Sequence, residues 1–354
     1  MAPQPLPNNL DLTSISMISP AEGWAVGHTT PLTHYPNSNE PGKNYVDPVL
    51  LHHEQGRWSQ AALPTFNPNW GAIELNSIVM VSANEGWAVG NSVLPPNANG
   101  VQVGIVLHFL NGQWAVTYEH RASRISAVFM RSASDGWMVG ISDHSQQQQA
   151  LLLHYDGSQW VSVFDSVFAH IVPDTVAGVS ANSIWVTGTD YSRTGPDGGD
   201  PGRIFHYNGT RWTRESVNLS NARLVGFGLM PSGEGWVVGG LPGGAGPYPT
   251  KASYGLILHY DNGVWKEQAR IKAPPDNSYF ILSSVAMVSS GEGWIVGPNG
   301  TILHYQAGAW SQVASPTTKD LSSVVMLSAN EGWAVGVQST LLHYVNGTWS
   351  QVND

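Results

Sequence analysis

The apolar positions of this chain recur in a two-part pattern that repeats seven times. Each repeat holds a Gly-Trp-x-Val-Gly segment and then a Leu-His-Tyr-x-Asn-Gly-x-Trp segment, or close variants of both. The first tryptophans of the repeats are Trp24, Trp87, Trp137, Trp185, Trp236, Trp294 and Trp333, and the second are Trp58, Trp114, Trp160, Trp212, Trp265, Trp310 and Trp349. Short β-branched runs separated by tight-turn and Asn-Gly signals predict four antiparallel strands per repeat, here called A to D.

Repeats of this length, each with four strands, predict an all-β fold: a seven-bladed β-propeller with four antiparallel strands per blade. We expect a Pro-rich lead-in at 1–11 and a single domain at 12–354, with blades at about 12–61, 76–118, 125–164, 175–216, 224–269, 283–314 and 322–353. Blade one begins with its own strand A and blade seven ends with its own strand D. The ring is therefore expected to close by packing without a shared blade, unless residues 1–10 add a strand.

The repeat motifs resemble a known family. Asn-Glu-Gly-Trp-Ala-Val-Gly at 330–336, Thr-Ile-Leu-His-Tyr at 301–305 and Asn-Gly-x-Trp at 346–349 are similar to the BNR/Asp-box-like propeller repeats of Ycf48-type photosystem II assembly factors. The resemblance covers all seven repeats at the level of the repeat. It implies the propeller fold, a role in assembly and basic surface patches that meet a partner.

Composition narrows the function classes. Charged residues make up 11% of the chain, cysteine is absent and the net charge is −10. The sequence has no cluster of Lys or Arg, which argues against nucleic-acid binding. It also has no 18-residue apolar run of the kind that spans a membrane. The N-terminus has no signal-peptide pattern. We nevertheless expect an extracytoplasmic or secreted bacterial protein. The sequence leaves open whether the protein is a monomer or an oligomer.

Strand direction divides the predicted propeller into two faces. The short-turn face carries the A–B and C–D turns, whereas the long-loop face carries the B–C and D–A connections. Insertions at 28–48, 91–104, 141–150, 189–202 and 240–255 all fall on the long-loop face, as do the linkers 59–76 and 266–283. Long loops held on a rigid scaffold often carry function. We therefore expect a rim that is high around blades one to five, and an asymmetric cleft above the central channel.

Residues that recur in every blade are expected to serve the fold. One strand C position holds histidine in all seven blades: His52, His108, His154, His206, His259, His304 and His343. We expect each of these imidazoles to hydrogen-bond to a turn. Arg131 is off the apolar pattern at the end of its strand A, and it is expected to pair with Asp135 in the neighbouring turn.

The leading hypothesis is a non-catalytic binding or assembly propeller that engages a glycan, a peptide or another protein on the long-loop face. We expect the ligand group to be neutral and polar, and we expect no cofactor. Trp70 is the one tryptophan outside the repeat, and it either packs under its linker or meets the ligand. The ligand-binding candidates are Trp70, His34, Tyr35, His120, Tyr191, Arg193, Tyr248, Tyr254 and Tyr279.

An enzyme remains the alternative, either a polysaccharide lyase or a glycoside hydrolase on the same face. Such chemistry needs paired carboxylates or a His/Tyr pair. The candidates are Glu74, His144, His170, Asp190 and Tyr191. No nucleophile elbow, phosphate loop or metal-binding histidine motif is present. Asp190, Asp197 and Asp200 form a weak Ca²⁺ candidate because their Gly-rich loop carries several oxygen ligands.

Overall fold

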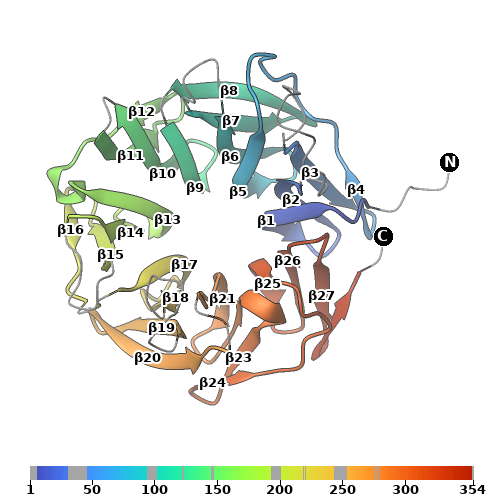
Figure 1. Ribbon diagram of the computed structural model, residues 1–354, viewed down its shortest axis with the longest axis vertical. Helices are drawn as coiled ribbons and strands as arrows, with labels where there is room; N and C mark the ends of the chain where they lie inside the picture. The colour runs from blue at the N-terminus through green and yellow to red at the C-terminus, as the bar shows by residue number, and fades with distance from the viewer. Residues whose placement is uncertain are drawn as a thin grey trace.

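The protein forms a ring of seven four-stranded sheets around a central channel (Figure 1). The computed structural model describes residues 6–30, 46–93, 102–121, 123–144, 147–192, 201–217, 219, 221–242, 253–275, 277 and 279–352. Each sheet consists of four consecutive antiparallel strands, so blade one is β1 to β4 and blade seven is β25 to β28. The seven-bladed propeller predicted from the repeat is confirmed.

The strands fall into four classes by their radial position. The A strands line the channel: β1 (Leu10–Ser19), β5 (Ile73–Ser82), β9 (Ser123–Ser132), β13 (Ile171–Ser180), β17 (Arg223–Leu229), β21 (Ser284–Ser289) and β25 (Leu321–Ser328). The B strands follow: β2 (Glu22–Thr29), β6 (Glu85–Val93), β10 (Asp135–His144), β14 (Ser183–Asp190), β18 (Gly235–Leu241), β22 (Glu292–Val296) and β26 (Glu331–Gly336).

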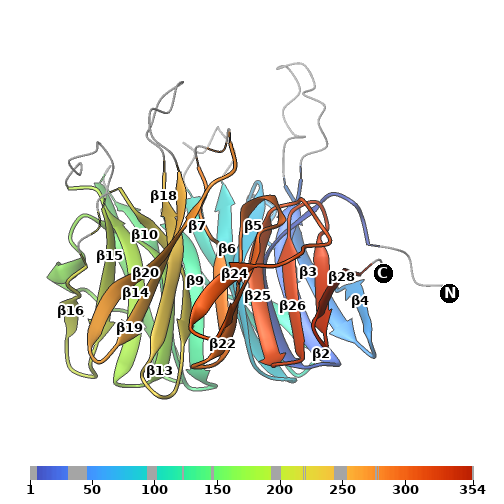
Figure 2. The ribbon, with the colours of Figure 1, turned by 90° about the horizontal axis from the view of Figure 1, so that it is seen from below.

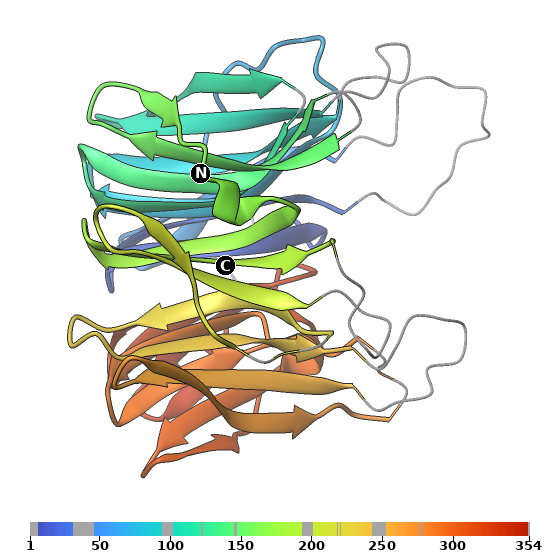
Figure 3. The same ribbon diagram turned by 90° about the vertical axis from the view of Figure 1, so that its left-hand side faces the viewer.

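The two outer classes complete each blade. The C strands are β3 (Pro48–Glu54), β7 (Gln102–Leu110), β11 (Gln147–Tyr155), β15 (Gly202–Tyr207), β19 (Tyr254–Asp261), β23 (Ile302–Gln306) and β27 (Leu341–Val345). The D strands are β4 (Arg57–Gln60), β8 (Gln113–Arg121), β12 (Trp160–Ser162), β16 (Trp212–Arg214), β20 (Val264–Lys272), β24 (Ala309–Gln312) and β28 (Thr348–Gln351). Two 3₁₀ turns, η2 (Ser166–Phe168) and η3 (Pro298–Gly300), lie between strands. Figures 2 and 3 show the tight A–B and C–D turns together on one side, the short-turn face.

The repeated tryptophans join neighbouring blades. Each first tryptophan lies against the histidine of its own strand C, as Trp24 does on His52 with ring centroids 4.1 Å apart. At six of the seven blade interfaces it also meets the second tryptophan of the next blade edge to face, as Trp24 meets Trp114 at 5.4 Å. Such aromatic pairs contribute about 0.5–1.5 kcal/mol beyond their buried area. The same tryptophan therefore organises its own blade and its contact with the next one.

The repeated histidines bind the acidic residues of the A–B turns. His52 Nε2 lies 2.7 Å from Glu22 Oε1, and equivalent pairs occur in five other blades. Blade four has Ser183 in place of the acid, and His206 pairs with its hydroxyl at 3.3 Å. The predicted hydrogen bond from the imidazole to a turn is present in six blades. In blade six His304 Nε2 lies 3.5 Å from Glu292 Oε1, an ion-pair distance without a hydrogen bond.

The ring closes by packing between complete blades, as predicted. Trp333 of blade seven meets Trp58 of blade one at 5.5 Å, in one apolar cluster with Leu10 and Leu12. The Ser339 amide donates to Leu10 O at 2.6 Å, and the Gln338 amide donates to Asp11 Oδ1 at 3.0 Å. No described strand is shared between blade one and blade seven.

Candidate binding site at the channel mouth

One register position of the A strands places charged residues at the long-loop end of the channel. The backbone carbonyl at this position lies against the last glycine of the neighbouring B strand; a Cβ built on Gly90 would lie 1.9 Å from Glu74 O. The residues at this position are Asp11, Glu74, Arg124, Val172, Arg223, Ile281 and Asp320. Five of these seven are charged in a chain with few charges, so this position is set apart from the rest of the repeat.

A β-bulge two residues further along carries a second row of polar side chains. The register shifts between Leu12 and Ser14, so that Thr13 is the extra residue in β1. Its hydroxyl donates to Leu75 O of the next blade at 2.7 Å, and Asn76 Nδ2 donates in the same way to Ile125 O at 2.8 Å. The bulges therefore join adjacent A strands around the channel and add Asn76, Ser126 and Asp174 to its lining.

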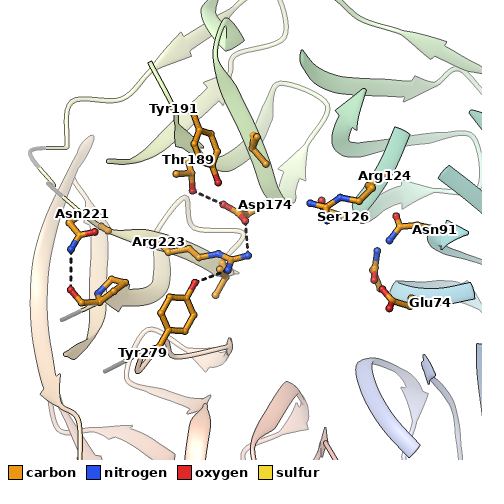
Figure 4. A pocket seen from close by; sticks show the side chains of 15 residues that line it. Glu74, Asn91, Arg124, Ser126, Asp174, Thr189, Tyr191, Asn221, Arg223 and Tyr279 are labelled. Atoms are coloured by element: carbon orange, nitrogen blue, oxygen red, sulfur yellow. Dashed lines mark hydrogen bonds and ion pairs between the residues drawn. The ribbon is translucent and has the colours of Figure 1, made fainter. Parts of the chain in front are cut away.

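These two rows line a cavity of about 720 Å³ on one side of the channel mouth. Its walls come from blades two to five and from the linker that follows blade five. The lining residues are Glu74, Asn76, Asn91, Arg124, Ser126, Val172, Asp174, Thr189, Tyr191, Asn221, Ala222, Arg223, Val225, Pro242 and Tyr279 (Figure 4). The asymmetric cleft expected above the channel is present. Its lining carries two arginines and two carboxylates, whereas the sequence predicts a neutral polar ligand.

Arg223 is held from two sides. Its Nη2 lies 3.3 Å from Asp174 Oδ1, and its Nη1 donates to the Tyr279 hydroxyl at 3.0 Å. Thr189 donates to the second oxygen of Asp174 at 3.2 Å, so both carboxylate oxygens have a partner. Burial raises the pKa of Asp174, and this outweighs the lowering effect of Arg223. Burial would lower the pKa of Arg223, but Asp174 and Tyr279 raise it.

Arg124 and Glu74 lie across the cavity from this group (Figure 4). Both side chains are exposed to solvent. Neither forms a hydrogen bond or ion pair with any residue in the described ranges, although Arg124 lowers the pKa of Asp174 through its charge. Asn91 is nearly buried beside them, and its side-chain oxygen accepts from the Ile125 amide at 3.0 Å. One guanidinium and one carboxylate are therefore available to a bound molecule.

The structure brings three of the sequence candidates together in this cavity: Glu74, Tyr191 and Tyr279. Trp70 is not in the cavity lining. It packs within its linker against Phe66, with ring centroids 6.2 Å apart, and against the apolar cluster between blades one and two. Tyr254 begins β19 opposite Lys272, away from the lining. The ring of His120 in β8 of blade two is hydrogen-bonded to the hydroxyl of Ser123 at the start of β9 in blade three, and neither residue lines the cavity.

Asp190 is bound by basic residues of its own blade. Its Oδ2 lies 3.2 Å from Arg203 and 3.8 Å from Arg214, and its Oδ1 accepts from Ser192. Burial would raise the pKa of Asp190, but Ser192 and the two guanidinium charges outweigh it and lower the pKa. A carboxylate that is already paired with two cations is a poor Ca²⁺ ligand and a poor proton donor.

Other candidates lie outside what the structure describes. His34, Tyr35, Arg193, Asp197, Asp200 and Tyr248 are not in the described ranges, and for His144 only the backbone, at the end of β10, is described. His170 lies between η2 and β13, its backbone carbonyl accepts from the Tyr191 amide at 3.0 Å, and it lines a second cavity with Ala150 and Phe168. In the described ranges no cluster of three or more His, Asp or Glu side chains is arranged to hold a metal ion. The calcium site therefore stays a prediction.

The structure confirms the pairing expected for Arg131 and corrects the insertion expected at 141–150. Arg131 pairs with Asp135 at 2.5 Å, as predicted. Arg124 and Arg223 also lie on the innermost strands, at the start of β9 and β17. The insertion expected at 141–150 is wrong for most of its length: β10 and β11 pair from Ile141 with Ala150 to His144 with Gln147. These residues extend the strands instead of forming a loop.

Solved propellers of the Ycf48 type have a similar fold over nearly the whole chain. A structure described as Ycf48 bound to a D1 peptide is 17% identical, with a TM-score of 0.59, and the match covers 97% of this chain and 95% of that one. Ycf48 from Cyanidioschyzon merolae is 12% identical with a TM-score of 0.59, covering 96% of this chain and 97% of that one. No family model and no curated protein matches the sequence. No helix of the described chain is long and apolar enough to cross a membrane.

Proposed function

We propose that this propeller is a non-catalytic binding module that holds a peptide segment of another protein in the channel-mouth cavity. The observation that carries this proposal is Arg124, an exposed guanidinium that has no partner among the described residues and that projects into a polar cavity. Guanidinium groups bind carboxylates through paired, charge-assisted hydrogen bonds. A peptide supplies such a group from its C-terminus or from an acidic side chain.

The remaining lining suits a peptide as well. Asn76, Asn91 and Asn221 offer amide groups of the kind that pair with a peptide backbone, although each already makes one bond inside the protein. The rings of Tyr191 and Tyr279 are more than half exposed at the rim and offer apolar surface to a side chain. Glu74 favours a basic group at a short distance from the carboxylate. The ligand class agrees with that of the similar Ycf48 structure, which is described as bound to a D1 peptide.

We favour peptide over glycan because the lining is charged. A neutral ligand, as expected from the sequence, could be either a glycan or a peptide. An unpaired guanidinium favours the peptide, because a sugar site does not need one. The extracytoplasmic location expected from the sequence is also part of this proposal. Fractionation of the native host would test it.

The enzyme alternative would use Glu74 and Asp174, the two carboxyl groups of the cavity. The raised pKa of Asp174 is a property that a general acid needs. Both of its oxygens are engaged, however, by Arg223 and Thr189. We therefore assign Asp174 to holding Arg223. Turnover of chromogenic glycosides that is lost in Asp174→Asn would reverse this assignment.

The binding proposal is tested with an array of peptides made with free and with amidated C-termini. Arg124→Ala should weaken binding of carboxylate-bearing peptides by about ten- to a hundredfold, the worth of a charge-assisted hydrogen bond. Arg57→Ala is the matched control, because Arg57 is an exposed arginine at the start of β4, next to the C–D turn of the short-turn face. Affinities measured by fluorescence anisotropy that fall equally in both variants would show that Arg124 acts only through net charge. A lack of any array binding would remove the proposal.

A further inference from the structure

The outer edge of blade three is incompletely covered. Strand β11 runs from Gln147 to Tyr155, but β12 pairs only with its last three residues, from Leu153 to Tyr155. One more bond follows, from the Val163 amide to Leu152 O at 2.9 Å. The outer side of residues 147–151 therefore extends past the end of strand D.

In the described residues of the other six blades, no overhang is longer than two residues. In blades two and five the C strand is also long, but strand D pairs with it throughout, up to Val103 with Arg121 and Tyr254 with Lys272. In the remaining blades the C strand starts at, or two residues before, the equivalent of Leu152. These starting residues are Pro48, Gly202, Ile302 and Leu341. Within the described residues, blade three alone has a long strand C and a short strand D.

The uncovered edge presents hydrogen-bonding groups to solvent. Leu152 O points outward because it accepts from the Val163 amide, and alternate residues of a strand share their direction. The N–H and C=O groups of Ala150 and Gln148 therefore point outward as well, and they bond to no described residue. Natural edge strands are usually protected by charge or proline. Residues 147–150 read Gln-Gln-Gln-Ala and carry neither.

An apolar cavity of about 480 Å³ lies along the same edge. Its lining includes Ala150, Leu152, Val163 and Phe168, with Phe164 at its rim. Phe164 is 85% exposed, the most exposed large apolar side chain among the described residues. The chain leaves the edge here because η2 carries Phe168 inward, where its ring packs against Phe205 at 4.4 Å.

Blade five shows what occupies the equivalent place. There Ile271 of strand D pairs with Gly255, the equivalent of Ala150. Ile271 and Ala269 are half-buried, and they pack against the apolar cluster that contains Phe280. An extended segment with an aliphatic side chain at every second position therefore fits against this class of edge, and the chain itself supplies one in blade five.

We propose that the outer edge of blade three binds an extended peptide segment of a partner protein by β-strand addition. The segment runs antiparallel to β11, bonds to the outward backbone groups of Ala150 and Gln148, and places an aliphatic side chain opposite Ala150 in the cavity. Main-chain bonds supply affinity in this mode of recognition, and pockets for alternate side chains supply specificity. This site is on the outer rim, so it does not depend on the channel-mouth proposal.

The test uses a fluorescent heptapeptide, Glu-Gln-Ala-Arg-Ile-Lys-Ala, which copies residues 267–273 and is blocked at both ends. Ala150→Pro removes one outward donor, and proline is tolerated on an edge strand where its nitrogen faces solvent. Blade one already has Pro48 at the equivalent register, so the fold accepts proline there. The peptide should bind the native chain and bind Ala150→Pro at least about tenfold more weakly.

Two further measurements separate binding from folding. The same peptide, N-methylated at alternate amides, should lose binding to the native chain because its own donors are gone. Phe164→Ala should weaken binding while leaving thermal unfolding unchanged, since this side chain is exposed. If Ala150→Pro does not fold, these two measurements decide the matter.

Several outcomes would overturn the proposal. These are equal binding by the native chain and Ala150→Pro, equal binding of the methylated peptide, or no binding at about 1 mM peptide, the weak limit for a specific site. A dimer of the native chain that Ala150→Pro abolishes would identify a second copy of this chain, and not a partner peptide, as the occupant of the edge.

Discussion

At the scale of the residue, Asp174 has the most informative surroundings. Burial raises its pKa above the ordinary value of 3.8 in spite of Arg223. The folded protein therefore takes up this proton at a higher pH than the unfolded chain does. The resulting stabilisation is present at low pH and is lost as the pH rises through the folded pKa. Asp174→Asn should remove this contribution, so that the native chain gains unfolding free energy relative to the variant as the pH is lowered. Urea unfolding at a series of pH values measures the difference.

Asp156 provides a control with the opposite sign. The Ser158 hydroxyl and the amides of Ser158 and Gln159 lower the pKa of Asp156 to about 2 from 3.8. Its stabilising contribution is present above the unfolded value and is lost as the pH falls toward 2. The unfolding free energy of the native chain should therefore fall relative to that of Asp156→Asn as the pH is lowered. The same direction of change for both variants would contradict the assigned environment of Asp174.

Single residues were also the hardest features to predict from the sequence. The periodic Trp, His and acidic positions follow from the repeat, because each blade needs them for the same contacts. Arg124 and Arg223 were missed because they come just before the first core residues of β9 and β17, where a charge reads as the end of a linker. The available signal was the charge itself, which recurs at this position in five blades of a chain with few charges.

At the scale of the element, the last glycine of strand B allows strand A to approach closely. A Cβ at Gly90 would lie 1.9 Å from Glu74 O, which is backbone and cannot rotate away. Gly90→Ala should therefore destabilise the fold by about 1–3 kcal/mol, as overpacking does. Gly291→Ala is the matched control, because a Cβ there meets no atom within 4 Å, and its effect should stay within about 0.5 kcal/mol. Equal midpoints of chemical unfolding for both variants would contradict the close packing.

The lengths of the elements were predictable only in part. The core residues of strands B and C were predictable from their apolar runs. The polar extension of β10 and β11 beyond Ile141 did not, since Ser-Asp-His and a run of glutamines read as a loop. What holds these residues in strands is the ladder that continues from the buried part of the blade, and a periodic pattern does not contain that information.

At the scale of the whole molecule, the closing interface has the same edge-to-face tryptophan contact as five of the interfaces inside the ring. Trp333 meets Trp58 across the closure at 5.5 Å, and Trp236 meets Trp310 between blades five and six at 5.4 Å. Trp333→Ala and Trp236→Ala should therefore cost similar unfolding free energies, each about 3–5 kcal/mol. Chemical unfolding followed by circular dichroism compares the two. A much smaller loss for Trp333→Ala would mean that the closing interface opens in solution.

The closure also bears on how such a chain can change over generations. Every strand ladder lies within one continuous segment, and no described strand spans the two ends of the chain. A gene rearrangement that duplicates or deletes one repeat would leave the other ladders whole and would alter mainly the curvature of the ring. The channel-mouth residues belong to blades two to five and to the linker after them, and the open edge belongs to blade three. Both features would be inherited with those repeats.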